Sequence, residues 1–377
     1  MLRNSPSSRR RTAGFSLVEI MVALAIGMLA SIVILQMFAL SEERSRTATN
    51  GGDAQSNGVL TFYQLQSNIA RSGYGINALG LFNCSTTWQV ASGSNLVKSL
   101  RLAPATINPV DATGAVIIPA GDPNTDTLLV MYGNSDGQPE GNKADTTSAP
   151  SYTMQMPSSF AVGDRVIAAP IMPPAPAGCS ADLIVDRITA VAATTVTVAT
   201  GASGTSLFNL GRGPNGLATA GAQNGPTVLA YAIRNGNLTA CDFMVNDCSI
   251  AANTGDSTVW EPLASNIVSL RAEYGRDTSA SMDGFVDAYD QTTPATACDW
   301  ARVAALRIGL VARSAQFEKT TVTAAAPVWD GTADVAIDLS KNPNGSANPT
   351  WQNYRYKLFQ AVIPLRNITA MGVPTGC

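Results

Sequence analysis

The stretch from Gly14 to Leu40 reads GFSLVEIMVALAIGMLASIVILQMFAL and is apolar almost without a break. The polar residues that interrupt it are Ser16, Glu19, Ser31 and Gln36. This run is longer than the roughly 20 residues that a membrane-spanning helix needs. The sequence therefore predicts a transmembrane helix over residues 15–40, preceded by a short leader at residues 1–14.

The charges on either side of this run predict its orientation. Basic residues lie before it and acidic residues follow it at once, namely Arg3, Arg9, Arg10, Arg11, Glu42 and Glu43. By the positive-inside rule, the N-terminus then lies in the cytoplasm. We therefore expect a single-pass protein of the bacterial inner membrane whose large C-terminal part lies in the periplasm.

An ordinary secretory signal peptide is the alternative interpretation of this segment. Such a peptide is cut after small residues at the far end of its apolar region, and Ala39-Leu40-Ser41 fits that requirement. However, the apolar region of a signal peptide is only about 7 to 15 residues long. A carboxylate in a membrane helix costs about 2.5 to 3.5 kcal/mol on insertion scales, so Glu19 indicates a function beyond anchoring.

The composition of the chain narrows the functions available to it. The 377 residues include no histidine, which removes the usual general base near neutral pH and the usual zinc ligand. Without the four leader arginines, 20 basic residues face 27 acidic ones, so the body lacks the basic surface that nucleic acid requires. We expect neither catalysis nor nucleic-acid binding.

The helix is expected to continue beyond the membrane over residues 41–75. A stretch without proline places apolar and polar residues at helical spacing, which predicts a stripe facing the domain core: Val59, Phe62, Tyr63, Gln66, Ile69 and Ala70. Gly51-Gly52 weakens this helix and predicts a bend or, alternatively, a loop between two helices. Gly73-Tyr74-Gly75 is typical of a glycine-based helix end.

Residues 76–377 are predicted to form a large β-rich domain. Short runs of β-branched and aromatic residues recur between Gly, Pro, Asn and Asp clusters, which favours antiparallel strands. The expected strands are residues 127–132, 165–169, 183–199, 228–233, 238–245, 267–274, 303–313, 335–339 and 354–365. Residues 134–157, 170–178 and 201–226 are predicted to be loops or insertions. Asn235-Gly236 predicts a tight hairpin turn, and Arg307 is expected to reach a sheet edge or a carboxylate.

Six cysteines, all after the apolar run, suit an oxidising compartment and allow fifteen full pairings. Only Cys241 and Cys248 are close enough in sequence to suggest a local disulfide. The tryptophans Trp88, Trp260, Trp329 and Trp351, taken as exposed aromatics, are assigned to packing.

An acidic loop raises the question of a metal site. Asp277, Asp283 and Asp287 lie in a Gly- and Ser-containing segment of the kind that can hold Ca²⁺. The segment from Thr278 to Met282 breaks the alternation of an EF-hand loop. We therefore expect no cofactor and interpret the loop as a solvated acidic turn, with Ca²⁺ as the alternative.

The string Ala13-Gly14-Phe15-Ser16-Leu17-Val18-Glu19-Ile20 resembles the class III signal of type IV prepilins and type II secretion pseudopilins. The resemblance implies that prepilin peptidase cuts after Gly14 and methylates the new amine of Phe15. It also places Glu19 at the fifth mature position, where it would pair with such an amine during subunit assembly.

Further strings resemble the PilW family of large minor pilins. They are residues 70–75 (ARSGYG), 267–277 (IVSLRAEYGRD), 300–308 (WARVAALRI) and 363–367 (IPLRN). The resemblance implies an α+β pilin-like fold, with a long N-terminal helix packed on an antiparallel β-rich domain. It also implies a minor subunit that helps to initiate type IV pilus assembly near the tip, with other minor pilins, the major pilin and a large adhesin as partners.

Two other functions stay open from the sequence. A type II secretion pseudopilin shares the leader and Glu19 and differs in the machine that it joins. A membrane-anchored periplasmic hydrolase or binding module would keep an intact N-terminus or be cut near Ser41.

Overall fold

The computed structural model describes residues 16–88, 99–111, 113–135, 141–169, 182–202, 204–211, 226–372 and 377, without the side chains of residues 39–40, 42–51 and 53. The chain divides into two units, Met1–Gly52 and Asp53–Cys377, which are described separately. Together they contain an N-terminal apolar helix and a large, mostly antiparallel β-rich domain, so the α+β class is confirmed.

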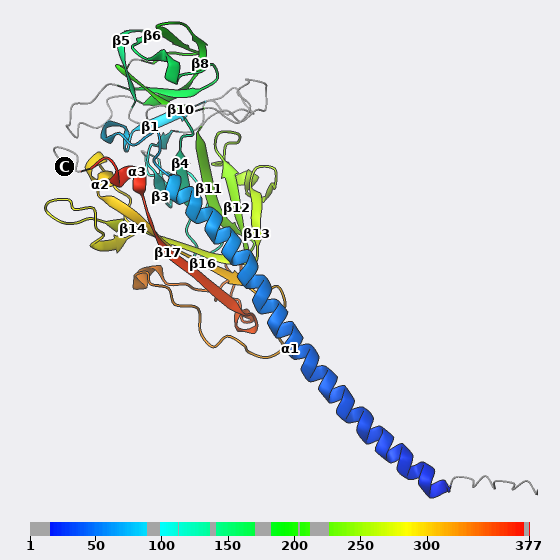
Figure 1. The fold of residues 1–377 in the computed structure, drawn as a ribbon. Coiled ribbons are helices and arrows are strands. Elements are labelled where there is room, and N and C mark those ends of the chain that lie inside the picture. The colour runs from blue at the N-terminus through cyan, green and yellow to red at the C-terminus, as the bar shows by residue number, and fades with distance from the viewer. Residues whose placement is uncertain are drawn as a thin grey trace, which may run out of the picture. The chain divides into compact units, whose positions relative to one another are not determined.

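Helix α1 spans Leu17–Arg71 and contributes to both units (Figure 1). It stays helical through Gly51 and Gly52, so the predicted alternative of a loop between two helices is wrong. The helix ends as the sequence indicates, because Gly73 adopts a φ of +83° that favours glycine. The Gly73 amide then donates to the Met131 carbonyl at 2.9 Å, which ties the helix end to the domain.

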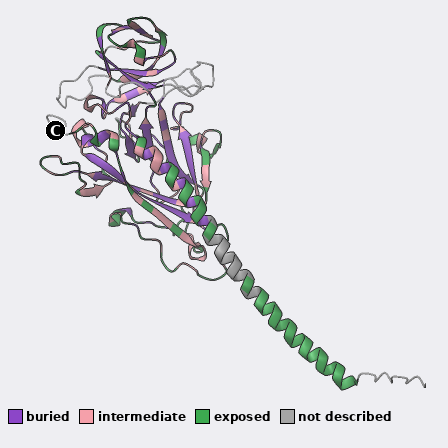
Figure 2. Ribbon diagram, in the orientation of Figure 1, coloured by how far each residue is buried: buried purple, intermediate pink, exposed green. Residues whose placement is uncertain are grey.

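The first part of α1 exposes its apolar side chains. Leu17–Phe38 has a mean hydropathy of 2.6, and none of this segment is buried within the structure (Figure 2). Its 22 residues are long enough to cross a bilayer. A segment of this kind needs an apolar environment that the chain itself does not supply.

The last part of α1 belongs to the core of the second unit. Ala54, Leu65 and Ile69 are buried there, whereas Val59 and Tyr63 are 47% and 72% exposed. The predicted stripe was therefore wrong at those two positions. Gly58 lies against Phe359, whose ring an added Cβ would overlap, while Val59 and Tyr63 lie on the exposed side of the helix.

Two sheets share this core with α1. Residues from the helix and from both sheets form one buried cluster. The four-stranded sheet has the order β15 (Ala288–Asp290), β14 (Ile267–Arg276), β16 (Val303–Arg313) and β17 (Tyr356–Pro364). The five-stranded sheet has the order β13 (Glu261–Ser265), β12 (Asn237–Asp242), β11 (Thr227–Arg234), β4 (Leu128–Tyr132) and β3 (Ala105–Ile107). Asn235 and Gly236 have positive φ between β11 and β12, so the predicted hairpin turn is confirmed.

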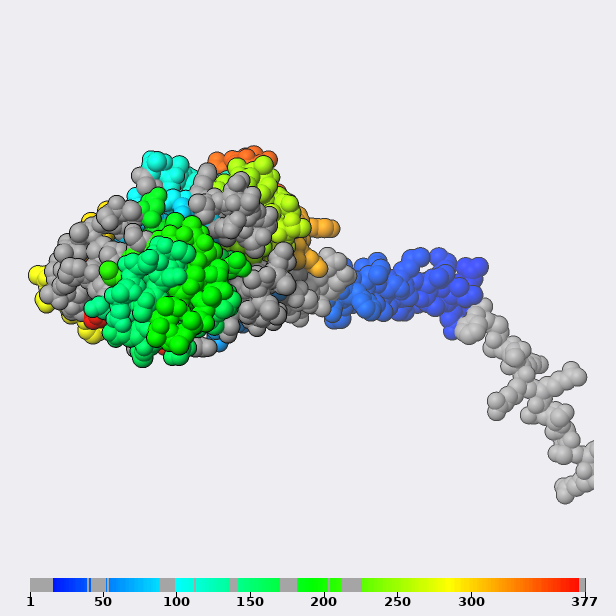
Figure 3. Space-filling model, turned by 90° about the horizontal axis from the view of Figure 1, so that it is seen from above, coloured from blue at the N-terminus to red at the C-terminus, as the bar shows by residue number. Residues whose placement is uncertain are grey.

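A third sheet contains a barrel inserted between β4 and β11. Its order is β2 (Leu100–Arg101), β1 (Ser85–Trp88), β8 (Leu183–Val191), β7 (Arg165–Ala169), β10 (Ser206–Gly211), β5 (Asn142–Ser148), β6 (Ser151–Met154) and β9 (Thr195–Val198). Because β9 also pairs with β8, the last six strands close on themselves. Figure 3 looks down on this barrel, whose atoms gather in one green patch.

Two of the segments predicted to be loops or insertions contain strands of the barrel, so the loop alternative is wrong there. Strands β5 and β6 lie within residues 134–157, and β10 lies within residues 201–226. Residues 170–178 lie outside the described residues. Strands β6 and β9 alternate buried and half-buried side chains around Tyr152 and Val196, whereas β10 is buried throughout. Their Thr, Ser and Gly content hid these patterns.

Other sequence predictions are refined by the packing. The expected strand at residues 335–339 is instead the 3₁₀ turn Ala333–Val335 followed by extended chain, whose Val335, Ile337 and Leu339 cover Val311 beside Trp329. The tryptophans taken as exposed are buried at Trp88, Trp260 and Trp329 and half-buried at Trp351.

Arg307 reaches a carboxylate, as expected. Its Nη1 lies 3.3 Å from Oε2 of Glu273, the residue opposite it on β14, which is fully buried. The Glu273 carboxylate also accepts from the Thr332 amide at 2.8 Å. A buried charge of this kind is tolerated because it is paired and hydrogen-bonded.

The Gly58 contact yields a first prediction. Gly58→Ala places a methyl group into the Phe359 ring and should lower the free energy of unfolding by about 1–3 kcal/mol, the usual cost of overpacking. Gly52→Ala is the matched control, because nothing lies within 4 Å of its Cβ and alanine favours a helix by about 1 kcal/mol. Urea unfolding of the full chain in detergent measures the free energy of unfolding of both variants. An equal gain in stability for the two would contradict the tight contact at Gly58.

Candidate assembly site and its surroundings

Of the three residues that the leader motif predicts, the structure describes Glu19. Gly14 and Phe15 lie outside the described residues. Glu19 lies in the first turn of α1, and its amide donates to the Ser16 carbonyl at 3.0 Å. Its side chain is exposed in a segment of otherwise apolar residues. A carboxylate at a helix N-terminus is favoured by the helix dipole, which agrees with this position.

One face of α1 continues from Glu19 with small residues. Ala23, Gly27 and Ser31 follow at four-residue intervals and share this face. The Ser31 hydroxyl donates to the Gly27 carbonyl at 2.8 Å, so it is satisfied within the helix. The face thus presents one carboxylate beside a shallow apolar strip, and small residues of this kind let a second helix approach closely.

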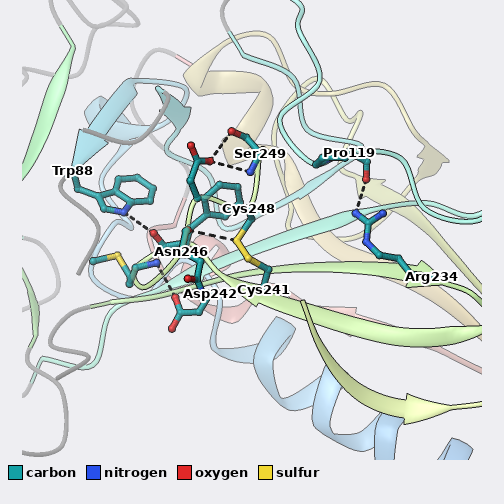
Figure 4. The surroundings of a disulfide bond; sticks show 11 residues. Trp88, Pro119, Arg234, Cys241, Asp242, Asn246, Cys248 and Ser249 are labelled. Carbon is teal, nitrogen blue, oxygen red and sulfur yellow. Dashed lines mark hydrogen bonds between the residues drawn. A yellow bond between two sulfur atoms is a disulfide. The ribbon is translucent and has the colours of Figure 1, made fainter. Parts of the chain in front are cut away.

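Disulfides close two parts of the domain. Cys241 at the end of β12 is bonded to Cys248 seven residues later, the pair that the sequence spacing singled out (Figure 4). Cys298 in α2 (Ala297–Ala301) is bonded to Cys377, a pairing with no sequence signal among the fifteen alternatives. No cysteine is free in the part of the chain that the structure describes.

Asp242, next to the first disulfide, was not singled out by the sequence. Its carboxylate accepts one hydrogen bond, from the Met244 amide at 2.8 Å (Figure 4). Burial raises the pKa of Asp242 to about 6, and the Met244 hydrogen bond offsets this only in part. Nothing in the sequence marked this residue, because its partial burial depends on packing in the folded domain.

The acidic loop uses its carboxylates to bind its own backbone. Asp277 is buried, and its Oδ2 accepts from the amides of Asp283 and Gly284 at 2.7 and 2.8 Å. The Thr278 amide donates to Asp287 and holds the pKa of that carboxyl below its usual range. Among the described residues, no group of three or more acidic, His or Cys side chains is placed to hold a metal ion.

Calcium binding at Asp277, Asp283 and Asp287 stays a hypothesis with a direct test. Calorimetric titration of the chain with Ca²⁺ should show heat of binding if these carboxylates exchange their backbone partners for the cation. The absence of heat at millimolar Ca²⁺ would reject the site.

Comparison with models of known families supports the N-terminal motif found in the sequence. Residues 9–35 match the model of the prokaryotic N-terminal methylation motif, which includes Gly14, Phe15 and Glu19. Together with the apolar helix, this match supports a pilin-like protein related to type IV pili, and it fits a membrane anchor at Leu17–Phe38.

A second match covers the C-terminal part of the β-rich domain. Residues 230–367, from β11 to the short helix α3 (Arg366–Thr369), match the model of PilW, the type IV pilus-assembly protein W. The resemblance to the PilW family predicted from the sequence is thereby confirmed. No curated protein and no solved structure matches the chain significantly.

The environment of Asp242 predicts how stability depends on pH. Its pKa is about 6 in the folded chain and about 3.8 ordinarily, so the folded state holds the proton more tightly between these values. Stability should fall as pH rises from about 4 to 6, by up to about 3 kcal/mol from this group. Asp242→Asn should therefore stabilise the chain at pH 7.5 and have little effect at pH 4.

Urea unfolding at the two pH values, with the disulfides intact, measures the effect of Asp242→Asn. Asp256→Asn is the control, since that carboxylate is exposed and its pKa is lowered by hydrogen bonds from Thr258. An equal effect of Asp242→Asn at both pH values would contradict a raised pKa.

Proposed function

We propose that the chain is a minor pilin that takes part in initiating type IV pilus assembly and is incorporated near the pilus tip. The observation that carries this proposal is the combination of a methylation motif with Glu19 on an exposed apolar helix and a PilW region in the same chain. The family matches support a structural role, and no step of this function requires catalysis by the chain.

The first step of the proposed function is processing at the membrane. Before assembly, Leu17–Phe38 holds the precursor in the inner membrane with the β-rich domain in the periplasm. Prepilin peptidase then cuts between Gly14 and Phe15 and methylates the new amine. This amine is a cation at the edge of an apolar helix, and a carboxylate is its natural partner.

The second step is the registration of subunits through Glu19. In lipid, an isolated carboxylate costs several kcal/mol, so pairing with the Phe15 amine of a neighbouring subunit removes that cost. The small residues Ala23, Gly27 and Ser31 on the same face allow the neighbouring helix to approach. A head-to-tail contact of this kind propagates a helical filament, in which neighbouring helices replace lipid.

The partners and final location follow from this scheme. The chain meets prepilin peptidase first, then other minor pilins and the major pilin, with a large adhesin at the tip. After assembly the chain leaves the membrane and lies in the pilus on the cell surface.

Substitutions at Gly14 and Glu19 test the two steps separately. Gly14→Leu should block processing while the precursor still inserts in the membrane, because the apolar run is unchanged. Glu19→Ala should permit processing but reduce recovery in sheared pili by about tenfold or more. Ser31→Ala is the control, since it changes a polar residue of the same face without removing a charge.

Mass spectrometry of the mature N-terminus and immunoblots of sheared pili provide the measurements. An N-methylated Phe15 start supports the scheme, whereas a start near Glu42 would show a conventional signal peptide and overturn it. Normal piliation with Glu19→Ala would reject the pairing step. Copurification with secretion pseudopilins instead of minor pilins would assign the chain to type II secretion.

A further inference from the structure

Strand β17 is a long edge strand with one free side. It stands at the end of the four-stranded sheet and pairs only with β16 among the described strands (Figure 1). The pairing runs from Ala305 opposite Pro364 to Arg313 opposite Tyr356 without a register shift. The nine residues of β17 therefore form a regular edge that a further strand can extend.

The register shows which backbone groups face outward. The Leu365 amide donates to the Ala304 carbonyl, and the Ser314 amide donates to the Arg355 carbonyl. In an antiparallel pair the bonded positions alternate, so the odd-numbered residues of β17 bond to β16. The amides and carbonyls of Leu358, Gln360 and Val362 consequently point away from β16, and within the described residues they have no hydrogen-bond partner.

The other sheet edges of the described chain are protected. Strands β2, β3 and β15 are two or three residues long. Strand β13 contains Pro262, and the register shifts where it pairs with β12. Short strands, proline and bulges are the usual devices that prevent edge pairing. Strand β17 has none of them until Pro364, the residue at which outward pairing must stop.

The charge and exposure of side chains on and beside β17 indicate what kind of segment could pair with its free edge. Val362 is 46% exposed, although it is apolar and lies in the middle of the free edge. Lys357 and Arg366 flank the edge as exposed cations, and no acidic residue lies between 356 and 366. The fitting occupant is therefore an extended apolar segment with carboxylates at its ends.

A second copy of this chain does not meet that requirement. In an antiparallel pair of β17 strands centred on Gln360, Lys357 would face Ile363 and Arg366 would face Tyr354 of the other copy, so neither cation would meet a carboxylate. In a parallel pair, each cation would lie beside its equivalent. Like charges placed opposite each other destabilise the parallel pair, and the antiparallel pair leaves both cations without an acidic partner.

We propose that the outer edge of β17 binds an extended strand of a different pilus subunit, which adds a fifth strand to this sheet. Backbone hydrogen bonds to Leu358, Gln360 and Val362 provide the affinity, while Lys357 and Arg366 pair with acidic residues of the partner. This interaction rests on the proposed function as a pilus subunit, and it adds the surface through which the domain recognises a neighbour.

Substitutions at Val362 test the edge in the full chain, expressed with the other pilus subunits. Val362→Pro removes an outward amide without removing a bond to β16, and Val362→Lys adds a charge that opposes edge pairing. Both should reduce copurification of the neighbouring subunit by about tenfold. Val328→Lys is the matched control, because Val328 is 88% exposed and lies outside the sheets.

Two further readouts identify the occupant. A photocrosslinking amino acid at position 362 should join the chain to an extended, acidic segment of another pilus subunit. Amide hydrogen exchange should be fast at Leu358, Gln360 and Val362 in the isolated chain and slow in the complex. Crosslinking to a second copy of this chain, or unchanged exchange in the complex, would overturn the proposal.

The failure of this proposal is distinguishable from that of the proposed function. If the wild-type chain is processed and recovered in pili while both Val362 variants copurify normally, only the edge interaction is rejected. If the wild-type chain is absent from pili, the proposed function fails whatever the edge binds. Thermal unfolding of Val362→Pro and Val362→Lys shows whether each variant is folded. A variant that unfolds at the wild-type temperature but does not copurify with the neighbouring subunit has lost binding and is not misfolded.

Discussion

The close contact between α1 and β17 is the constraint on which the domain depends. Gly58 has no side chain, so the helix approaches Phe359 closely enough for Leu65 and Ile69 to reach a core shared by two sheets. Each of these two side chains contributes about 1.5–3 kcal/mol by its burial. The same helix carries Glu19 and the apolar segment Leu17–Phe38. The element expected to join the filament is therefore also a structural part of the domain.

Much of this organisation could be predicted from local sequence. The apolar run, the position of Glu19, the turn at Asn235-Gly236 and strand β16 depend on composition, periodicity and turn chemistry, which act over a few residues. The spacing of Cys241 and Cys248 likewise contained enough information to suggest their bond. The N-terminal motif was recognisable for the same reason, since its residues are adjacent.

The features that the sequence did not show depend on contacts between distant segments. The bond between Cys298 and Cys377, the partial burial of Asp242 and the exposure of Tyr63 are all decided by packing. The barrel was missed because its strands are rich in Thr, Ser and Gly, residues that also mark loops. The free edge of β17 could not be predicted at all, because it requires the order of strands in the sheet.

The barrel and the four-stranded sheet differ in whether they match the PilW model. It lies between β4 and β11, outside residues 230–367, and has its own buried cluster around Tyr152 and Phe160. The family region instead includes the whole four-stranded sheet with β17. The surface proposed for subunit recognition therefore belongs to the part that matches the PilW model, and the barrel lies outside that part.

The bond between Cys298 and Cys377 has a mechanical consequence. A filament transmits tension through its subunits, and a domain under load lengthens as its strands unravel. The bond encloses a sequence separation of 79 residues, including β16 and β17, in a covalent loop. At about 3.4 Å per extended residue, about 270 Å of chain cannot be drawn out while the bond is intact. In the proposed pilus, this bond would limit how far the domain can extend under load and would keep β16 and β17 inside the protected segment.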